Sequence, residues 1–363
     1  MRVFLDNIVF SIQQAGGVSV YWYELLQGMH KNGLPIHCLN ARPGSDNIFE
    51  RQLDYSQFTC IKESRIPQRY LRYLPLQYAL PEGAIFHGGY LRVSPQRNIL
   101  NILTVHDFVH ERKLATGFPR GMANMLQKRY GIERADGIIC ISESTKRDLL
   151  HFFPAVDPAK IKVIYHGLAD DFFPLPQSET GEHPFGGPFI LYVGSRRHYK
   201  NFSVAVQTMK LLPRSFKLVI VGGEAWTKAE MDEVETLIPG RYHLLSGVSP
   251  AALNKLYNQA FCLLYPSAYE GFGFPPGEAM KAGCPVVTTN AASMPEVVGE
   301  AGLLADFPEP AAFAVRIRRL EQEGYRQQLI ALGLERAAAF TWTRSVQETI
   351  QFYKDRWHYK FSR

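Results

Sequence analysis

The 363-residue chain has few cysteines, and none of them stand close together in the sequence. The five are Cys38, Cys60, Cys140, Cys262 and Cys284. Disulfide frameworks and zinc sites use cysteines at short, repeated spacings, so this scatter excludes a small disulfide-stabilised secreted fold and a zinc-ribbon type of site. We therefore expect a protein of a reducing compartment such as the cytoplasm.

Long apolar runs and a large excess of basic charge are also absent. No segment reaches the roughly 18 apolar residues of a membrane-spanning helix, and Met1–Phe10 contains Asp6 and lacks the apolar core of a signal peptide. The net charge of +6 is too small for the dense basic patches of a nucleic-acid-binding protein. These absences favour a cytoplasmic enzyme that does not bind nucleic acid.

The chain is long enough for two domains, because a single hydrophobic core stops growing at roughly 250 to 300 residues. Short apolar segments alternate with helical patterns almost from end to end, which is typical of α/β domains with parallel sheets. The stretch from Asp170 to Pro188 is rich in Pro, Gly, Ser and Glu and predicts a linker. We expect domains at 1–172 and 188–342, with a last helix at 343–360 that packs back on the first domain.

Each half of the chain contains six predicted strands. In the first half they are Arg2–Asn7, Pro35–Asn40, Ala84–His87, Ile99–Val105, Gly137–Ile141 and Ile161–Tyr165. In the second half they are Phe189–Val193, Lys217–Val221, Tyr242–Leu245, Phe261–Tyr265, Pro285–Thr289 and Gly302–Ala305. This pattern predicts two Rossmann-like, doubly wound domains. Because such sheets bind ligands at the carboxyl ends of their strands, we expect the two domains to face each other across a cleft that holds the site.

The most informative motif follows the strand that ends at Tyr265 and reads E-G-F-G-F-P-P-G-E from Glu270 to Glu278. Gly271 and Gly273 permit positive φ and close approach of the backbone to a ligand. The two prolines after Phe274 suit the start of a helix, whose N–H groups and dipole favour an anion such as a diphosphate. The alternative is a Gly/Pro-rich turn with two surface glutamates.

The two glutamates, with seven residues between them, resemble the family-4 retaining glycosyltransferases, which have the two-domain GT-B fold. The segments from Ser293 to Gly299 and from Ala301 to Leu304 are similar to the stretch that these enzymes carry after the next strand. The resemblance implies that Glu270 contacts the transferred sugar and that Glu278 holds the ribose of a nucleotide-sugar donor. It also implies that Gly271, Phe272 and Gly273 line the donor diphosphate.

The segment from Gly194 to Asn201, G-S-R-R-H-Y-K-N, follows the first strand of the second domain. Its arginines and lysine could neutralise a leaving diphosphate, and Lys200 has the family spacing from Gly194. In many relatives an arginine comes directly after the glycine, whereas this chain has Ser195 there, so the phosphate contact could come from Arg196 or Arg197. We favour Arg196 together with Lys200, and the alternative is a solvated basic loop.

Metal ligands are not evident, because the chain has no Asp-x-Asp pair and no cluster of His, Cys and carboxylates at metal spacing. We expect neither a metal nor a bound cofactor. Arginine, lysine and a helix dipole would then stabilise the leaving group, which is the task that a divalent ion performs in other enzymes.

Three further segments resemble ligand-binding positions of the family. Gly16 and Gly17 correspond to a glycine pair that approaches the donor phosphates, although they could simply form a tight turn. His106 and Asp107 end a strand, so His106 could bind the donor sugar and Asp107 could orient or deprotonate the acceptor hydroxyl. The alternative is a structural His–Asp pair. Val248 follows a strand of the second domain, where relatives read the nucleobase with backbone groups.

The resemblance implies transfer of a hexosyl group, most often mannose or glucose, from a nucleotide-diphosphate sugar. The acceptor would be a saccharide or a lipid-linked oligosaccharide in cell-surface polysaccharide synthesis, as for an O-antigen or a capsule. The basic, aromatic stretch from Arg65 to Leu74 fits peripheral contact with an anionic membrane, or else a solvated helix whose arginines lie along its surface. Another GT-B enzyme, a phosphorylase or an epimerase, and a catalytically silent nucleotide-sugar-binding protein stay open as alternatives.

Overall fold

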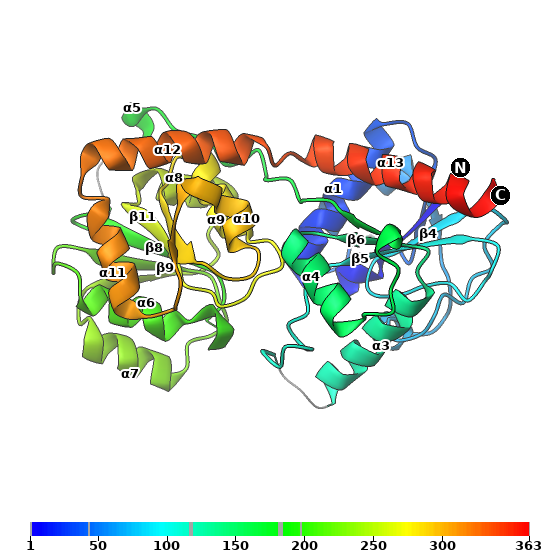
Figure 1. Ribbon diagram of the computed structural model, residues 1–363, viewed down its shortest axis with the longest axis horizontal. Coiled ribbons are helices and arrows are strands. Elements are labelled where there is room, and N and C mark those ends of the chain that lie inside the picture. Colours follow the sequence, from blue (N-terminus) through cyan, green and yellow to red (C-terminus); the bar gives the residue numbers. More distant parts are fainter. Residues whose placement is uncertain (1, 43, 116–118, 181–183, 197, 363) are drawn as a thin grey trace. The chain divides into compact units, whose positions relative to one another are not determined.

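A computed structural model describes residues 2–42, 44–115, 119–180, 184–196 and 198–362. The chain divides into two compact units. Unit 1 contains residues 1–167 together with 342–363, and unit 2 contains residues 168–341. Each unit is an all-parallel β-sheet with helices packed on it, as the alternation of strands and helices predicts (Figure 1).

Unit 1 has a seven-stranded sheet in the order β3-β2-β1-β4-β5-β6-β7. Its strands are β1 (Val3–Asp6), β2 (Ile36–Leu39), β3 (Thr59–Ile61), β4 (Ile85–Gly88), β5 (Leu100–Val105), β6 (Gly137–Cys140) and β7 (Ile161–Val163). Its helices are α1 (Gly17–Lys31), α2 (Gln68–Leu71), α3 (Arg120–Arg134), α4 (Glu143–Phe152) and α13 (Trp342–Phe361). The strand order reverses between β1 and β4, which makes the carboxyl ends of these strands a ligand-binding edge.

Unit 2 has a six-stranded sheet in the order β10-β9-β8-β11-β12-β13. Its strands are β8 (Phe189–Val193), β9 (Lys217–Val221), β10 (Tyr242–Leu245), β11 (Cys262–Tyr265), β12 (Val286–Thr289) and β13 (Gly302–Ala305). Its helices are α5 (Gln177–Thr180), α6 (Phe202–Lys210), α7 (Lys228–Leu237), α8 (Pro250–Gln259), α9 (Phe274–Lys281), α10 (Met294–Val298), α11 (Pro310–Arg319) and α12 (Glu323–Ala338). Here the order reverses between β8 and β11.

Most strands are short, continuous apolar runs because helices cover both faces of a parallel sheet. All six residues of β5 and all five of β8 are buried. Ser142 caps helix α4, since its hydroxyl accepts a hydrogen bond from the Thr145 N–H at 3.0 Å. Strand β3 was not predicted, because two of its three residues are exposed and the run is too short to show a pattern.

Helix α13 belongs to unit 1 although it follows all of unit 2 in the sequence. It lies along α1 (Figure 1), and a Cβ atom on Gly28 of α1 would come within 2.5 Å of Val346. Tyr353 is fully buried and its hydroxyl contacts Nδ1 of His87 on β4 at 2.5 Å. The Trp357 indole donates to the carbonyl of Gly83 at 2.7 Å, so α13 is part of the unit 1 core.

The segment predicted as a linker lies within unit 2, and the division between the units falls at Gly167 and Leu168 rather than near residue 172. Two side chains of α8 hold its backbone. The Phe173 N–H donates to Asn254 at 3.1 Å, and the Leu175 N–H donates to Asn258 at 2.7 Å. The lack of sequence periodicity in this segment therefore does not mean that it is detached from unit 2.

Candidate functional site

Lys200 and Glu270 meet at the point of unit 2 where the strand order reverses. Lys200 follows β8, Glu270 follows β11, and these two strands are neighbours in the sheet. The Lys200 ammonium forms an ion pair with the Glu270 carboxylate and also donates to the Tyr265 hydroxyl at 3.0 Å. The Tyr265 hydroxyl in turn donates to Glu270 at 2.8 Å. The structure thus brings together two of the residues that the sequence predicts for this site.

Hydrogen bonds to backbone carbonyls hold together the loop that carries Lys200 and the loop that carries Glu270. Asn201 adopts a left-handed conformation with φ of 53°, and its side-chain amide donates to the carbonyl of Pro266 at 2.9 Å. The Ala268 N–H donates to the carbonyl of Tyr199 at 2.8 Å. The position of Lys200 relative to Glu270 is therefore fixed by the loops themselves and not by the ion pair alone.

Burial keeps Tyr265 in its neutral form. The low polarity around the ring, together with the neighbouring Glu270 carboxylate, raises the pKa of the Tyr265 phenol well above its ordinary value. The phenol therefore stays protonated and donates its hydrogen bond to Glu270 at any physiological pH. Sequence reasoning did not assign a role to Tyr265, although its position at the end of β11, directly before the glutamate loop, could have indicated one.

The loop from Gly271 to Gly273 has a conformation that needs glycine. Gly273 has φ of 103°, and a Cβ atom there would lie 2.3 Å from Cε of Met294. The Ser293 hydroxyl lies within hydrogen-bond distance of the carbonyls of Glu270 and Phe272, at 2.9 and 2.8 Å. Ser293 therefore fixes the loop from the start of α10, a role that the sequence motif did not reveal.

The structure limits the predicted contribution of the α9 N-terminus and of Phe272. Pro275 and Pro276 have no N–H, and the Gly277 N–H donates to the carbonyl of Gly273 at 3.4 Å, so the first turn offers fewer donors than the motif suggested. The ring of Phe272 is buried and packs edge-on against Phe340 at 5.5 Å. An anion here would consequently meet the loop backbone and the helix dipole.

Glu278 lies on α9, half-buried, and accepts a hydrogen bond from the Tyr257 hydroxyl at 3.1 Å. Loss of solvent around the carboxyl raises the pKa of Glu278 to about 7; the Tyr257 hydrogen bond lowers it and the negative charge of Asp171 raises it further. The carboxyl thus titrates near neutral pH. An uncompensated acid of this kind is typical of a site whose partner is a ligand.

Arg196 has a different environment from the one predicted for a phosphate contact. Its side chain is only 1% exposed, and Nε donates to Glu230 at 3.0 Å. The two terminal nitrogens donate to the carbonyls of Gly222 and Glu224, and the guanidinium stacks on Trp226 at 3.8 Å from the ring centre. All three nitrogens are engaged, so Arg196 fixes the loop after β8. The alternative residue, Arg197, lies outside the described residues.

Val248 is half-buried in the loop that follows β10. Gly247 before it has φ of 64°, and Ser249 after it caps α8 by accepting from the Ala252 N–H at 3.3 Å. The loop therefore has a defined conformation at the carboxyl end of a strand, where its backbone groups can contact a ligand.

In unit 1, Gly16 and Gly17 stand at the start of α1, after the 3₁₀ helix Asn7–Ser11 that follows β1. Gly16 has φ of 155°, and a Cβ atom there would come within 2.7 Å of the Gln13 side chain. Gln13 donates to the Ser19 hydroxyl at 3.2 Å, and that hydroxyl donates to the Gly16 carbonyl at 2.9 Å. The glycine pair therefore also has a structural reason, which is the tight turn into α1.

His106 and Asp107 follow β5 in unit 1 and are both half-buried. Burial lowers the pKa of His106 to about 4; Asp107 opposes this shift and the Lys128 charge adds to it, so the imidazole is neutral at pH 7. The ring packs edge-on against Tyr21 at 5.3 Å. The Asp107 carboxylate accepts from the Val109 N–H at 3.2 Å, and Lys128 donates to the Asp107 carbonyl at 2.8 Å. A neutral histidine can both donate a hydrogen bond to a sugar hydroxyl and accept one from it.

The described part of the chain contains no group of three or more His, Cys, Asp and Glu side chains arranged to hold a metal ion. No helix within the described ranges is both long enough and apolar enough to cross a bilayer.

Two sequence families match consecutive parts of the chain. Residues 15–172 match Glycosyltransferase Family 4, and residues 177–336 match Glycosyl transferases group 1. The O-antigen chain mannosyltransferase B of Escherichia coli is 30% identical over 290 residues, which cover 74% of each chain.

Solved structures show the same fold. Sucrose-phosphate synthase from Thermosynechococcus elongatus is 21% identical with a TM-score of 0.76, and covers 98% of both chains. HepE from Anabaena, solved in complex with UDP-glucose, is 14% identical with a TM-score of 0.73, and covers 97% of this chain and 99% of its own. The fold is of the GT-B type, and the chain belongs to glycosyltransferase family 4.

Proposed function

We propose that this glycosyltransferase moves a hexosyl group, most simply mannose or glucose, from a nucleotide-diphosphate sugar to a hydroxyl of a saccharide or lipid-linked oligosaccharide. The name of the Escherichia coli relative supports mannose and O-antigen synthesis, and the UDP-glucose complex of HepE supports a nucleotide-sugar donor. The contact between Lys200 and Glu270 carries the proposal, because it joins a cation for the leaving diphosphate to a carboxylate for the sugar.

The donor diphosphate would draw Lys200 toward its oxygens as negative charge builds up on the leaving group. The Lys200 side chain is 13% exposed, so its charge is partly desolvated. Its electrostatic interaction with the diphosphate would therefore be stronger than in bulk water. The backbone of Gly271–Gly273 and the dipole of α9 would add to this stabilisation. These groups supply what a divalent cation supplies in other transferases, and we therefore propose a metal-independent reaction.

Glu270 would accept hydrogen bonds from hydroxyls of the transferred sugar and stabilise positive charge at the reacting carbon. With the carboxylate already bound to Lys200 and Tyr265, we propose that the acceptor hydroxyl attacks from the face that the diphosphate leaves, with retention of configuration. Glu278 would bind the two ribose hydroxyls, and the backbone near Val248 would contact the base. In unit 1, neutral His106 would bind the sugar and Asp107 would orient the acceptor hydroxyl.

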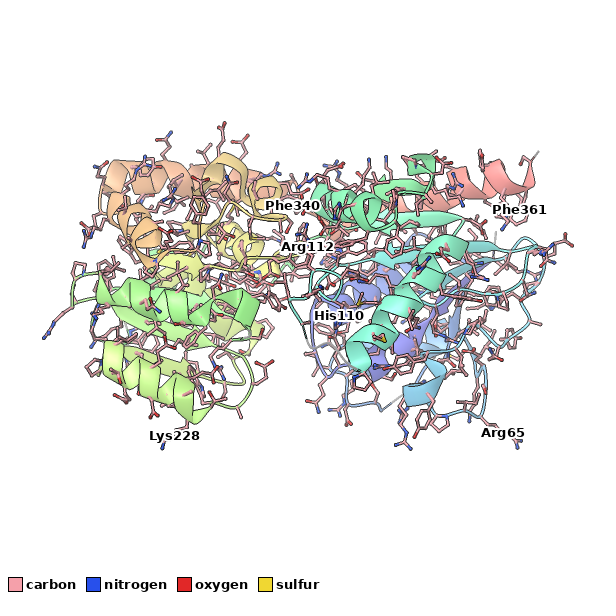
Figure 2. All side chains as sticks on the ribbon, turned by 60° about the horizontal axis from the view of Figure 1, so that its bottom comes forward. Arg65, His110, Arg112, Lys228, Phe340 and Phe361 are labelled. Carbon is pink, nitrogen blue, oxygen red and sulfur yellow. The ribbon has the colours of Figure 1, made fainter. Side chains whose placement is uncertain are left out.

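We also propose that unit 1 contacts an anionic membrane at the cytoplasmic face, where lipid-linked acceptors are found. The segment from Arg65 to Leu74 exposes Ile66, Tyr70, Tyr73 and Leu74, and helix α3 exposes Met122, Met125 and Leu126. Residues of both segments line one mostly apolar cavity of about 380 Å³. Figure 2 shows Arg65 at the outer edge of unit 1 and α3 across a face of the same unit. Apolar side chains beside arginines suit the interface of an anionic bilayer.

A thermal-shift panel with GDP, UDP, dTDP and ADP, each with and without EDTA, tests the donor part of the proposal. At a hundredfold over its Kd the donor nucleotide should stabilise the protein by about 2.7 kcal/mol, and EDTA should not change the shift. The matching nucleotide sugars are then tested for transfer, with the anomeric configuration of the product read by NMR. Absence of a shift with all four nucleotides would contradict the proposal, and an inverted product would contradict retention.

A further inference from the structure

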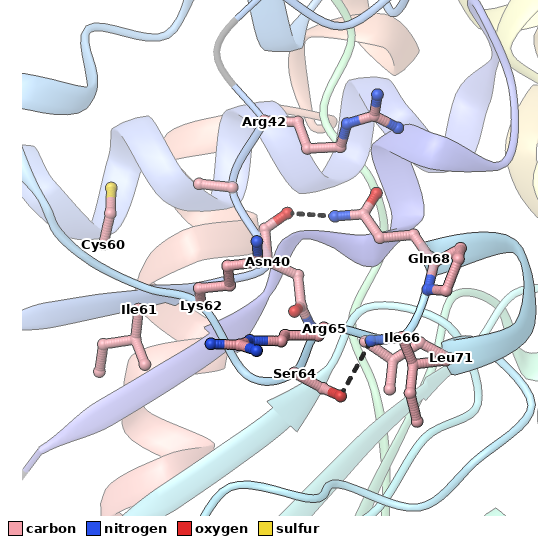
Figure 3. A pocket seen from close by; sticks show the side chains of 12 residues that line it. Asn40, Arg42, Cys60, Ile61, Lys62, Ser64, Arg65, Ile66, Gln68 and Leu71 are labelled. Carbon is pink, nitrogen blue, oxygen red and sulfur yellow. Dashed lines mark hydrogen bonds between the residues drawn. The ribbon is translucent and has the colours of Figure 1, made fainter.

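A cavity of about 540 Å³ in unit 1 lies at the carboxyl ends of β2 and β3 (Figure 3). Such a volume is ordinary for a small-molecule site, which spans roughly 300 to 1,000 Å³. It stands on the edge of the sheet where doubly wound domains bind ligands. None of the residues discussed for the donor lines this cavity.

The cavity is lined by three cations, Arg42, Lys62 and Arg65, and no acidic side chain is among the described residues that line it. All three are exposed, and none forms an ion pair with a residue that the structure describes. Figure 3 shows Lys62 and Arg65 side by side, with Arg42 on the other side of Asn40. The field inside the cavity is consequently positive, which favours an anionic ligand.

A buried network holds the nearby acids away from these cations. Arg92 is fully buried and pairs with Asp6 at 2.7 Å and with Glu63 at 2.6 Å. Glu63 stands between Lys62 and Ser64 in the sequence, yet its carboxylate is turned inward to Arg92 and to the Asn40 amide at 2.7 Å. Lys62 and Ser64, on either side of Glu63 in the sequence, line the cavity.

Asn40 fixes the floor of the cavity. It has φ of 60° and is buried, and its amide also donates to Asp6 at 2.9 Å. Its carbonyl accepts from the Gln68 amide at 2.8 Å, which ties the β2 end to α2. The Ser64 hydroxyl accepts from the Ile66 N–H at 3.1 Å, so its own hydrogen remains for a ligand in the cavity. Hydrogen bonds therefore hold the floor of the pocket, and a neutral donor lies beside its cations.

We propose that this cavity binds a phosphate group of the acceptor substrate, with Arg42, Lys62 and Arg65 as its charged contacts and Ser64 as a neutral donor. The inference rests on the proposed function, because it assigns the pocket to the acceptor of the transfer. Guanidinium groups match the oxygens of a phosphate in pairs, and an ammonium adds a point charge. A phosphate can reach the site on a soluble phosphosaccharide or as the headgroup of a membrane lipid.

Cys60 provides a direct reporter of occupancy. It lines the same cavity and is exposed, whereas the other four cysteines are buried. Partial burial raises the pKa of the Cys60 thiol, so labelling with the uncharged reagent N-ethylmaleimide is best followed above pH 8. Intact-mass spectrometry of the full chain then measures the labelling rate without any knowledge of the natural acceptor.

The experiment compares labelling with no addition, with inorganic pyrophosphate, and with phosphatidylglycerol or phosphatidylcholine vesicles. At ten times its Kd, pyrophosphate should slow labelling about tenfold, because about one tenth of the sites remain empty. The variant R42Q/K62Q should lose this protection, while R214Q/K228Q, with the same charge change on exposed residues of unit 2, should keep it. If phosphatidylglycerol is the only addition that slows labelling, and R42Q/K62Q loses this effect, the source of the phosphate is a lipid headgroup.

The proposal is overturned if neither pyrophosphate nor phosphatidylglycerol slows labelling, or if R42Q/K62Q remains protected to the same extent as the wild type. Equal protection by both lipids would show simple coverage by a membrane and would also count against it. The nucleotide thermal shift separates this result from the donor proposal. R42Q/K62Q should keep the wild-type nucleotide shift, whereas failure of the proposed function removes that shift from the wild type itself.

Discussion

The ammonium of Lys200 is bonded to the carboxylate of Glu270, although 70 positions separate the two residues in the sequence. Tyr265, at the end of β11, bonds to both, so three side chains form one connected group. Under the proposed function a donor would share Lys200 with Glu270. The loss of either residue would leave the other partly buried without its counter-charge.

Replacing Lys200 with Ala should lower kcat/KM by the equivalent of about 2 to 3 kcal/mol, because a charge-stabilising donor is removed from the leaving group. Steady-state transfer kinetics with the nucleotide sugar selected by the thermal-shift panel measure the effect. Lys210→Ala, at the exposed end of α6, is the matched control and should retain wild-type rates. Unchanged turnover in Lys200→Ala would show that the leaving group is stabilised by other residues.

Glu278→Gln should stabilise the protein at pH 8.5 and have a smaller effect at pH 5.5. Because the pKa of folded Glu278 is raised to about 7, its favourable contribution to folding is complete below the unfolded pKa near 4.5 and is lost as the pH rises through about 7. The amide has no such dependence. Thermal unfolding from pH 5.5 to 8.5 measures the difference, and parallel curves for the two proteins would be inconsistent with this assignment.

The same substitution should weaken nucleotide binding, since the ionised carboxylate is the better acceptor for two ribose hydroxyls. For the wild type we expect nucleotide affinity to rise between pH 6 and 8 as Glu278 ionises, and for Glu278→Gln we expect little change over that range. Isothermal titration calorimetry at several pH values provides the comparison. Equal pH profiles would remove Glu278 from the ribose contact.

Arg196→Ala should affect stability more than chemistry. The substitution leaves Glu230 without its cation and two loop carbonyls without donors, at a cost of about 3 kcal/mol. For a unit of this size we expect the melting temperature to fall by roughly 6 to 12 °C. Arg196→Lys should not restore it, because an ammonium cannot reproduce the three directions of the guanidinium. A stable Arg196→Ala protein that binds nucleotide poorly would instead favour a phosphate contact.

Reversal of charge at Arg65 and Arg69 should reduce binding to phosphatidylglycerol vesicles by at least about 2 kcal/mol, since each basic residue near an anionic surface contributes about 1 kcal/mol. Vesicle sedimentation measures the partition coefficient. The control is Arg214→Glu with Lys228→Glu, which changes the net charge equally on exposed residues of unit 2; Figure 2 labels Lys228 there. Equal losses in the two double variants would mean that only net charge matters.

Most of the fold could be predicted because its signals are local. The buried strands are continuous apolar runs, and the Ser142 cap marks the start of α4. Strand β3 could not be predicted, since Thr59–Ile61 pairs only at the edge of the sheet and is largely exposed. The boundary between the units was misplaced because side-chain amides of α8 hold a segment that has no periodicity of its own.

The motifs single out Lys200 and Glu270, which the folded chain brings together, and their roles in the reaction stay predictions. Residues that act through tertiary contacts were harder to predict from the sequence. Arg196 is of the residue type that binds phosphate, but its guanidinium donates to hydrogen-bond acceptors in the loop after β9 and in α7. Sequence spacing does not reveal these partners. Ser293 and Tyr265 likewise act through partners that only the folded chain brings near them.

The way in which α13 completes the core of unit 1 has a consequence for synthesis on the ribosome. Unit 2 is one continuous segment and can fold once residue 341 has emerged, whereas the core around His87 stays open until Tyr353 has been made. Unit 1 is thus translated first but finished last. A nascent chain would hold an unfinished unit 1 and a completed unit 2. If unit 2 binds the nucleotide as proposed, a premature stop within α13 should leave a protein that still binds nucleotide and aggregates through unit 1.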